Sequence, residues 1–392
     1  VNGGTDNISG ILGAAVYAFF DDNTLAECDI VLNGAQFRWA TSAQAATDAN
    51  TYFIDSILLH EIGHMVGLDH SPVGGANLMA RGESGLGLGI GLTTDEIAAA
   101  RALYPRSDWL LRQGTIQGAV RLNGAGVYGG VVTAEDAAGN LIAGTVTRQG
   151  GVYDLPALPP GAYQVRATPL DPANASALLL SGYDINAQTY AGAQTAFLPS
   201  EAQSISVTGG GTATANLTVT SGNPAFRIAR LRVPTTNPAR YELINAAVSV
   251  RPGDSNVIIG VLSPTLPTAN ASFTVSGDGI TARPPTYYPA LTQNYNLISA
   301  SIDVSPTATP GLRTLTVRRG TDVAYANGFL VVAPTTLDLN FDGVDDAFQR
   351  QYFPLFTAPE AGPLPDPDGD GFNNLAESIA GTNPLDPRSV LR

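Results

Sequence analysis

Residues 60–71 read HEIGHMVGLDHS, and this stretch holds all three histidines of the 392-residue chain. Residues four apart in an α-helix lie on the same side of it, so His60 and His64 would face one ion together. His70 lies ten residues after His60, about 15 Å along an uninterrupted helix, so the chain must turn back for it to join them. Gly67 is suited to that turn, because glycine takes the left-handed conformation that ends helices.

Three neutral imidazoles with an open fourth position are typical of a catalytic zinc site, whereas a structural site would be closed by a fourth protein ligand. Zinc in such a site lowers the pKa of its bound water to about 7. Glu61, beside the first ligand, would be the general base that takes the proton and delivers it to the leaving amine. The competing interpretation is that these are ordinary core or surface histidines. A bare HExxH arises by chance often, but the full HExxHxxGxxH is much rarer, which favours zinc.

The composition disfavours several other functions. All 20 basic residues are arginine, so no lysine is present for a Schiff base or a phosphate-binding loop. No histidine remains for a Ser-His-Asp triad. The formal charge of −14, without a basic block, disfavours nucleic acid and anionic membranes as partners, and no apolar run is long enough for a membrane span. The single cysteine, Cys28, has no disulfide partner, and a buried, inert thiol is favoured over a reactive one.

The N-terminal part of the chain mixes strand-like and helical patterns. Ile11–Phe20 and Cys28–Leu32 are apolar runs on either side of a turn-forming segment, and they predict two strands. Thr51–Val66 has a helical apolar pattern that carries the first two histidines. Thr93–Glu96 matches a capping box, which predicts a second helix ending near Tyr104-Pro105.

Beyond this part the pattern changes to short alternating apolar runs separated by Gly, Asn or Pro turns, which predicts β-sandwiches. These runs carry no histidine or cysteine and no readable catalytic cluster, so we interpret them as spacers or binding modules. We expect a multidomain chain with an α+β catalytic domain, two all-β sandwiches and a small calcium-binding module. The expected boundaries are 1–112, 113–221, 222–335 and 336–392.

The last segment is strongly acidic, with ten acidic residues and three arginines from Asp338 onward. The stretch DPDGDGFNNLAE at 366–377 fits an EF-hand loop, which places oxygen ligands at positions 1, 3, 5, 7, 9 and 12 around Ca²⁺. The expected ligands are Asp366, Asp368, Asp370, Phe372 through its carbonyl, Asn374 and Glu377.

An earlier stretch of the tail opens a similar but weaker loop. Its expected ligands are Asp338, Asn340, Asp342, Val344 through its carbonyl, and Asp346. Gln349 stands at position 12, where it cannot supply the bidentate carboxylate of a full EF-hand. We therefore expect one to two Ca²⁺ in the tail. Calcium is plentiful outside cells, which favours a secreted protein whose tail folds when the metal neutralises its charge.

The histidine motif resembles the zinc-binding signature of metzincins, and of the matrixin branch in particular, where a Ser follows the third His. Met79, nine residues after His70, resembles the Met-turn beneath the metal, and LTTDEIAAARALYP resembles the C-terminal helix of matrixins. ILGAAVYAFF is similar to the edge strand that binds substrate as an added β-strand, and ECDIVLN to the strand after it. The resemblance implies one catalytic Zn²⁺ on His60, His64 and His70, with Gly67 and Met79 in structural roles.

Three features depart from the matrixin pattern. Ala80-Arg81 follows Met79 in place of the usual Tyr-Pro. The resemblance therefore does not identify the residues that form the floor of the specificity pocket. No histidine remains for the second, structural zinc of animal matrixins. The stretch before His60 is too short for the first helix and strands, so the resemblance implies an N-terminally incomplete domain.

Other segments carry resemblances of their own. GGVYDLPALPPGAYQVRA resembles the prealbumin-like sandwich of carboxypeptidase regulatory domains, and ATPGLRTLTV with GFLVVAP resembles a bacterial immunoglobulin-like module of the IPT type. The tail is similar to calcium-binding repeats at the C-termini of bacterial surface proteins and to half of a dockerin.

The sequence thus predicts a secreted or cell-surface bacterial zinc metalloendopeptidase that acts on proteins or peptides. Its sandwiches would contact cell-surface or extracellular matrix components, and neither nucleic acid nor a membrane span is expected. Two alternatives stay open at this point. One is a calcium-stabilised adhesion or binding protein with an inactive or incomplete protease segment. The other is a protease that docks on a scaffold through a dockerin-like tail.

Overall fold

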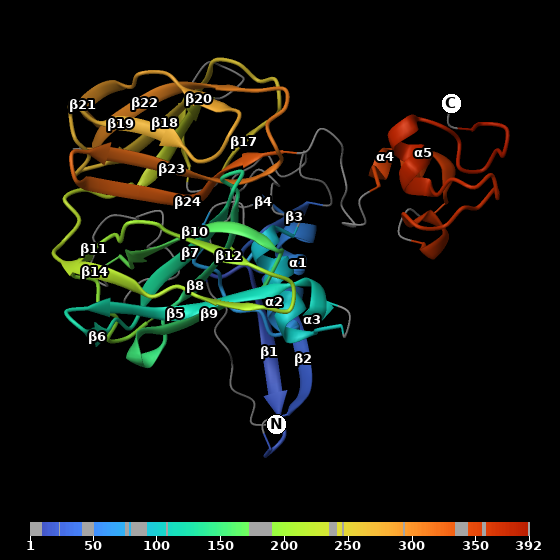
Figure 1. The fold of residues 1–392 in the computed structure, drawn as a ribbon, viewed down its shortest axis with the longest axis horizontal. Helices are drawn as coiled ribbons and strands as arrows, with labels where there is room; N and C mark the ends of the chain where they lie inside the picture. Colours follow the sequence, from blue (N-terminus) through green and yellow to red (C-terminus); the bar gives the residue numbers. More distant parts are fainter. Residues whose placement is uncertain are drawn as a thin grey trace. The chain divides into compact units, whose positions relative to one another are not determined.

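The computed structural model describes residues 10–22, 24–40, 51–74, 78–79, 92–106, 109–171, 190–234, 241–244, 247–292, 295–333, 344–354 and 358–390. Contacts divide the chain into two compact units, Val1–Ala333 and Pro334–Arg392. The described elements are mostly strands with few helices, as expected of a multidomain protein built on β-sandwiches (Figure 1). None of the described helices is long and apolar enough to cross a membrane.

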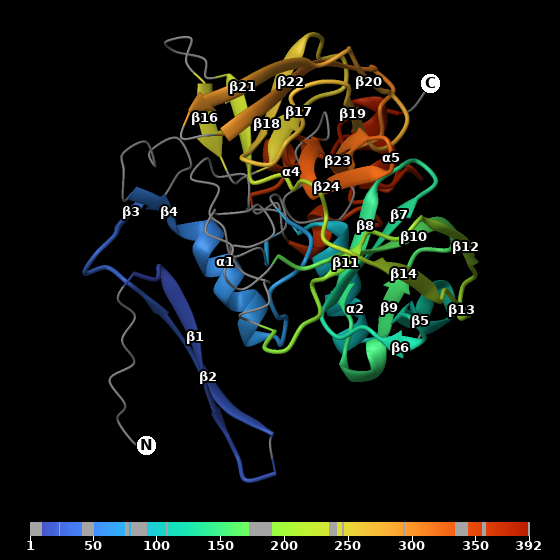
Figure 2. The same ribbon diagram turned by 90° about the vertical axis from the view of Figure 1, so that its left-hand side faces the viewer.

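In its described residues, the N-terminal region of the first unit contains two small sheets and three helices. The strands are β1 (Gly13–Phe19), β2 (Leu25–Leu32), β3 (Arg38–Ala40) and β4 (Thr51–Phe53), and the helices are α1 (Ile54–Met65), α2 (Thr94–Leu103) and α3 (Trp109–Arg112). The two predicted strands are present as β1 and β2, which pair antiparallel, and β3 pairs with β4 in parallel. Figure 2 shows the β1–β2 ribbon lying along α1 and extending past it.

The helix predicted over Thr51–Val66 begins at Ile54, three residues later than expected. Thr51–Phe53 form β4, because this β-branched and aromatic triplet pairs with β3. The prediction for α2 is confirmed, since the Thr93–Glu96 capping box is formed and caps the helix at its N-terminus.

The first β-sandwich packs two sheets around one core. Its strands are β5 (Gly114–Leu122), β6 (Ala125–Gly126), β7 (Gly130–Asp136), β8 (Leu141–Val146), β9 (Val152–Leu158), β10 (Gly161–Pro169), β11 (Phe197–Leu198), β12 (Gln203–Val207), β13 (Thr212–Thr214) and β14 (Leu217–Ser221). One sheet has the order β12-β10-β7-β8, and the other has the order β11-β14-β5-β13 with β6 and β9 also paired to β5. Side chains such as Ile116, Val132 and Val165 from both sheets are fully buried between them.

The second β-sandwich follows the same plan. Its strands are β15 (Arg230–Pro234), β16 (Tyr241–Ile244), β17 (Val248–Val250), β18 (Val257–Ser263), β19 (Ser272–Val275), β20 (Ile280–Ala282), β21 (Thr286–Thr292), β22 (Tyr295–Val304), β23 (Gly311–Arg319) and β24 (Asp322–Val332). The orders are β16-β15-β18-β22-β20, with β21 on β22, and β17-β24-β23-β19. Ile259, Ile298 and Leu315 are buried in its core.

The second unit is small and helical where it is described. It contains α4 (Asp346–Tyr352) and α5 (Asn374–Ala380), with a 3₁₀ turn at Pro359–Ala361 between them. Side-chain amides from both helices tie them to that turn. Gln349 Nε2 donates to the carbonyl of Ala361 at 2.8 Å, and Asn374 Nδ2 donates to the carbonyl of Glu360, also at 2.8 Å. The four expected domain boundaries stay a prediction, because contacts alone separate only these two units.

Candidate metal centre

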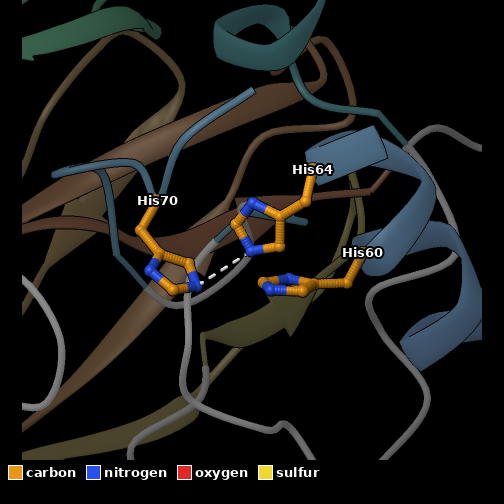
Figure 3. Close-up of side chains that lie close together, drawn as sticks. All are labelled: His60, His64 and His70. Carbon is orange, nitrogen blue, oxygen red and sulfur yellow. Dashed lines mark hydrogen bonds between the residues drawn. The ribbon is translucent and has the colours of Figure 1, made fainter. Parts of the chain in front are cut away.

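The three histidines converge although they come from two pieces of chain (Figure 3). His60 and His64 lie one turn apart on α1, and His70 lies on the loop that follows the helix. Each side chain offers one ring nitrogen, and these atoms lie within 4.8 Å of one another. Nε2 of His64 and Nε2 of His70 are 3.2 Å apart. All three side chains are half-buried, so the cluster borders solvent.

Two of these rings form hydrogen bonds with backbone carbonyls through Nδ1. Nδ1 of His60 lies 2.7 Å from the carbonyl oxygen of Leu78, and Nδ1 of His64 lies 2.8 Å from that of Leu68. A carbonyl only accepts hydrogen bonds, so each Nδ1 donates and each Nε2 of a neutral ring keeps its lone pair. Metal-binding histidines are usually oriented by such a second contact. The donor set therefore fits a metal ion that prefers imidazole nitrogen.

The turn predicted at Gly67 is present. Gly67 has φ +93°, in the left-handed region. Its N–H donates to the carbonyl of His64 at 2.7 Å, and the N–H of Leu68 donates to the carbonyl of Gly63 at 2.9 Å. These two hydrogen bonds satisfy carbonyls at the end of α1 and reverse the chain. His70 is thereby carried back toward His64.

Met79, the residue that resembles a Met-turn, packs against Gly63 of α1. Only 1% of its surface is exposed, and a Cβ added at Gly63 would be 2.3 Å from its sulfur. The N–H of Met79 donates to Glu96 Oε1 at 2.9 Å, so α2 holds this segment. Its carbonyl accepts from the N–H of Ser71 at 3.1 Å. This hydrogen bond brings Met79 beside the residue that follows His70. Ala80-Arg81 lies outside the described residues.

Glu61 belongs to α1, and its side chain is buried against β1. Its exposed fraction is 5%, and a Cβ added at Gly13 of β1 would be 2.9 Å from Glu61 Oε1. Burial raises the pKa of the Glu61 carboxyl, against opposing contributions from His64 and the backbone N–H of Ala15. Within the described structure, Glu61 Oε2 is buried without a hydrogen-bond partner. Cys28, by contrast, is half-buried on β2 and does not belong to the histidine cluster.

Sequence reasoning missed the groups that support the histidines. The carbonyls of Leu68 and Leu78 orient two rings, and Gly13 leaves room for the Glu61 carboxyl. A backbone carbonyl has no side-chain signature in a sequence. Glu96 was identifiable as a helix cap, but its hydrogen bond to Met79 was not.

The tail brings three of its predicted ligands together. Carboxylate oxygens of Asp366, Asp368 and Asp370 lie within 4.8 Å of one another. Gly369 and Gly371 have φ of +74° and +96°, and their N–H groups each donate to an oxygen of Asp366 at 2.9 Å. The loop therefore folds around its own acidic side chains. Like charges so close repel one another unless a cation neutralises them.

Glu377, the expected ligand at position 12, is fully buried. One carboxylate oxygen accepts from the hydroxyl of Thr382 at 3.1 Å, and Oε2 has no hydrogen-bond partner in the described tail. Burial raises the pKa of Glu377, and the charges of Asp368 and Asp370 raise it further. The Asn374 side chain is held by the carbonyls of Glu360 and Gly362, so α5 is anchored through it.

The weaker loop is only partly described. Asp338, Asn340 and Asp342 lie outside the described residues. Val344 and Asp346 are buried, and Asp346 Oδ2 lies 3.8 Å from a guanidinium nitrogen of Arg350. A second calcium ion in this loop stays a prediction.

Comparisons with known proteins identify the N-terminal region only. The family model of the matrixins matches residues 3–105, about a quarter of the chain. No curated protein matches the sequence. The match indicates a region of the metalloprotease type, for which zinc is the implied metal.

Solved structures share only a distant likeness with the chain. The major pilin subunit BcpA of Bacillus cereus is 10% identical, with 56% of this chain and 69% of that chain aligned and a TM-score of 0.22. The major pilin SpaD of Corynebacterium diphtheriae is 11% identical over 56% and 63% of the two chains, with a TM-score of 0.21. Fervidolysin from Fervidobacterium pennivorans, a keratinolytic enzyme related to subtilisin, is 12% identical over 57% and 31%, with a TM-score of 0.18. Scores this low do not assign a fold or a function. Residues 3–105 therefore form a metzincin-like region that carries the three-histidine cluster.

Proposed function

We propose that this chain is a secreted bacterial zinc endopeptidase of the matrixin type. One observation carries the proposal. Three histidine nitrogens lie within 4.8 Å of one another, and a buried carboxylate follows the first histidine on the same helix. The matrixin match over residues 3–105 supports the same conclusion independently of the geometry.

His60, His64 and His70 would hold one zinc ion. No fourth His, Cys, Asp or Glu joins the cluster among the described residues, which leaves a coordination position for solvent. When bound, zinc would lower the pKa of a coordinated water to about 7 and polarise the scissile carbonyl. The carbonyls of Leu68 and Leu78 accept hydrogen bonds from Nδ1 of two of these histidines, which would leave the Nε2 lone pairs available to the ion.

Glu61 would move the proton. Its Oε2 has no hydrogen-bond partner in the described structure, so it is available to accept a proton from the attacking water. Burial raises the pKa of the Glu61 carboxyl, which makes its carboxylate a stronger base than a solvent-exposed one. Gly13 lets β1 pass directly over this carboxyl and shield one side of it from water.

The substrate would bind along β1. In the described part of the chain β1 pairs only with β2, so its other edge has backbone groups for an added strand. An extended peptide there would lie next to Glu61, since Gly13 contacts that carboxyl. This arrangement favours unfolded or flexible segments of protein as substrates.

We further propose that the tail binds one Ca²⁺ through Asp366, Asp368, Asp370 and Glu377, with the carbonyl of Phe372 and Asn374 completing the predicted set. The unpartnered Oε2 of buried Glu377 supports this proposal, because an ionised oxygen buried alone is costly. Binding would neutralise part of the charge of the tail and stabilise it outside the cell. We also propose that the sandwiches contact cell-surface components. No individual residue is assigned to this role.

The test is cleavage of an unfolded, fluorescently labelled protein by the purified chain with zinc and calcium present. Glu61→Gln should lower the rate by at least about a hundredfold, as expected for loss of a general base. Glu27→Gln is the matched control, because Glu27 is exposed on β2. Equal rates in the parent and Glu61→Gln would contradict the assignment. Absence of cleavage by a zinc-loaded parent would instead favour the adhesion or binding alternative.

A further inference from the structure

The loop that follows the third histidine enters the junction of the two β-sandwiches. Val73, three residues after His70, is fully buried. It packs in one apolar cluster with Leu141 of β8, from the first sandwich, and with Ala247 and Leu312 beside and within strands of the second. A residue of the metzincin-like region is thus part of a core that it shares with both sandwiches.

Three glycines shape the slot around Val73. A Cβ added at Gly144 of β8 would be 2.7 Å from Val73 Cγ2, and one added at Gly328 of β24 would be 2.8 Å from Val73 Cγ1. A Cβ at Gly74 would be 2.1 Å from the ring of Phe329. Real Cβ atoms do not approach other atoms so closely, so each glycine is needed for this fit. The two methyl groups of Val73 therefore each face a glycine of a different sandwich.

Hydrogen bonds fix the same loop on both sides. The N–H of Gly74 donates to the carbonyl of Asn327 at 3.0 Å, in the second sandwich. Asp95 of α2 accepts from the N–H of Gly144 at 2.7 Å, in the first sandwich, and also from the hydroxyl of Ser71. The Ser71 hydroxyl in turn accepts from the N–H of Val73 at 3.0 Å. His70 is therefore followed directly by a residue whose side chain is tied to α2.

We infer that Val73 is a positioning residue of the metal centre, and that both β-sandwiches hold the third histidine in place through it. The inference rests on the proposed zinc site and adds that the sandwiches are part of its support. His70 lies on a loop without regular secondary structure. The position of its ring therefore depends on the contacts that hold this loop. Two of those contacts are made more than 200 residues away along the chain, at Asn327 and Gly328.

Substitutions in the sandwiches, far from the metal, should therefore alter the metal site. In the full chain, Gly328→Ala places a methyl group against Val73 and should weaken zinc affinity by about tenfold or more, the usual effect of disturbing the support of a ligand. Gly320→Ala is the matched control. Gly320 also has a positive φ, of +61°, and lies in the turn between β23 and β24, but nothing lies within 4 Å of its added Cβ. Zinc affinity is measured by competition with a chelating dye.

A second readout separates positioning from general destabilisation. Co²⁺ in place of zinc reports the coordination geometry through its visible absorption spectrum, which should change in Gly328→Ala and remain parental in Gly320→Ala. The double variant Val73→Ala/Gly328→Ala removes the clash with the Val73 methyl groups but keeps the one with the Gly74 carbonyl, so it should recover part of the affinity that Gly328→Ala loses. Recovery would support a direct contact.

Defined results overturn the inference. Equal zinc affinities and equal cobalt spectra in Gly328→Ala and Gly320→Ala would exclude the support role while leaving the zinc site intact. A parent chain that binds no zinc would instead remove the proposed function, and the inference with it. If Gly328→Ala does not fold, Val73→Ala is compared with Val317→Ala, which is also fully buried but in the core of the second sandwich. Weaker zinc binding in Val73→Ala alone supports the inference, and equal binding overturns it.

Discussion

The carbonyl of Leu78 accepts a hydrogen bond from Nδ1 of His60 at 2.7 Å, across eighteen residues of chain. Leu78 is followed by Met79, whose sulfur occupies the space left by the missing side chain of Gly63 on α1. The segment beneath the helix thus does two things. It supports the helix that carries two histidines, and it orients the first of them.

Gly63→Ala tests this arrangement. Alanine normally stabilises a helix relative to glycine by about 1 kcal/mol, but here its Cβ would lie 2.3 Å from the Met79 sulfur. We expect the variant to lose about 1–3 kcal/mol of unfolding free energy through overpacking and to bind zinc more weakly, because Leu78 moves with Met79. Thermal unfolding and chelator competition measure the two effects. A variant that is more stable than the parent, with unchanged zinc affinity, would contradict the account.

Glu96 should make stability depend on pH. Burial, with a further contribution from Asp95, raises the pKa of Glu96 from 4.5 to about 7. Below pH 4.5 the group is protonated in both states. Between 4.5 and 7 the unfolded chain has released this proton while the folded chain keeps it, so the free energy of unfolding falls as the pH rises. The loss is at most about 3 kcal/mol, and it does not grow further above pH 7.

The measurement is denaturation in EDTA at several pH values, followed by tryptophan fluorescence. Both tryptophans, Trp39 and Trp109, lie in the N-terminal region, so the signal reports on it. Glu96→Gln cannot titrate and should remove the decline between pH 4.5 and 7, even if it lowers stability at every pH through lost hydrogen bonds. Parallel pH profiles for the parent and Glu96→Gln would show that Glu96 is not the group responsible.

Arg166 of β10 should be an important buried link between the sandwiches, because it joins an ion pair within the first to a side chain of the second. It pairs with Glu135 at 2.8 Å, and both side chains are buried. The same guanidinium donates to Asn327 at 2.9 Å in the second sandwich. Arg166→Ala leaves the Glu135 carboxylate buried without its cation and should cost about 3–5 kcal/mol of unfolding free energy.

An exposed pair provides the control for Arg166. Arg283 and Asp303 lie 2.9 Å apart, but both side chains are well exposed. Arg283→Ala should change stability by no more than about 1 kcal/mol. Equal losses in Arg166→Ala and Arg283→Ala, measured by chemical denaturation, would contradict the assignment of Arg166 as a buried link.

Calcium should bind the tail through Glu377. The pKa of Glu377 is raised by burial and by the neighbouring aspartates, so a bound cation that shields these charges stabilises the ionised form. Glu377→Gln should weaken calcium binding by at least about tenfold. Glu360→Gln, at an exposed position in the same unit, should leave it unchanged. Isothermal titration with Ca²⁺ compares them, and equal affinities would remove Glu377 from the site.

The histidine cluster could be predicted because its determinants are local. Helical spacing places His60 beside His64, and the conformational freedom of Gly67 allows the chain to return; both depend on residues within one short stretch. The strands of the sandwiches were predictable for a similar reason, since alternation and turn residues mark each strand separately. The start of α1 could not be predicted, because Thr51–Phe53 pair with β3 instead of joining the helix. A local sequence pattern does not show pairing partners.

The support of the cluster could not be predicted. Val73 is one apolar residue in a loop, and its burial depends on Gly144 and Gly328, which the sequence separates from it by about 70 and 250 residues. Many glycines in this chain serve turns, so nothing marks these two as the walls of a slot. Contacts of this kind become visible only when the tertiary structure brings the segments together.

The most direct test of the central claim is zinc-edge X-ray absorption on the full chain loaded with one equivalent of zinc. We expect three imidazole nitrogens at about 2.0–2.1 Å and one further light ligand from solvent, with one imidazole lost in each of His60→Ala, His64→Ala and His70→Ala. A sulfur ligand, which would have to come from Cys28 or a methionine, would contradict it. So would a spectrum of fully hydrated zinc that none of the three substitutions changes.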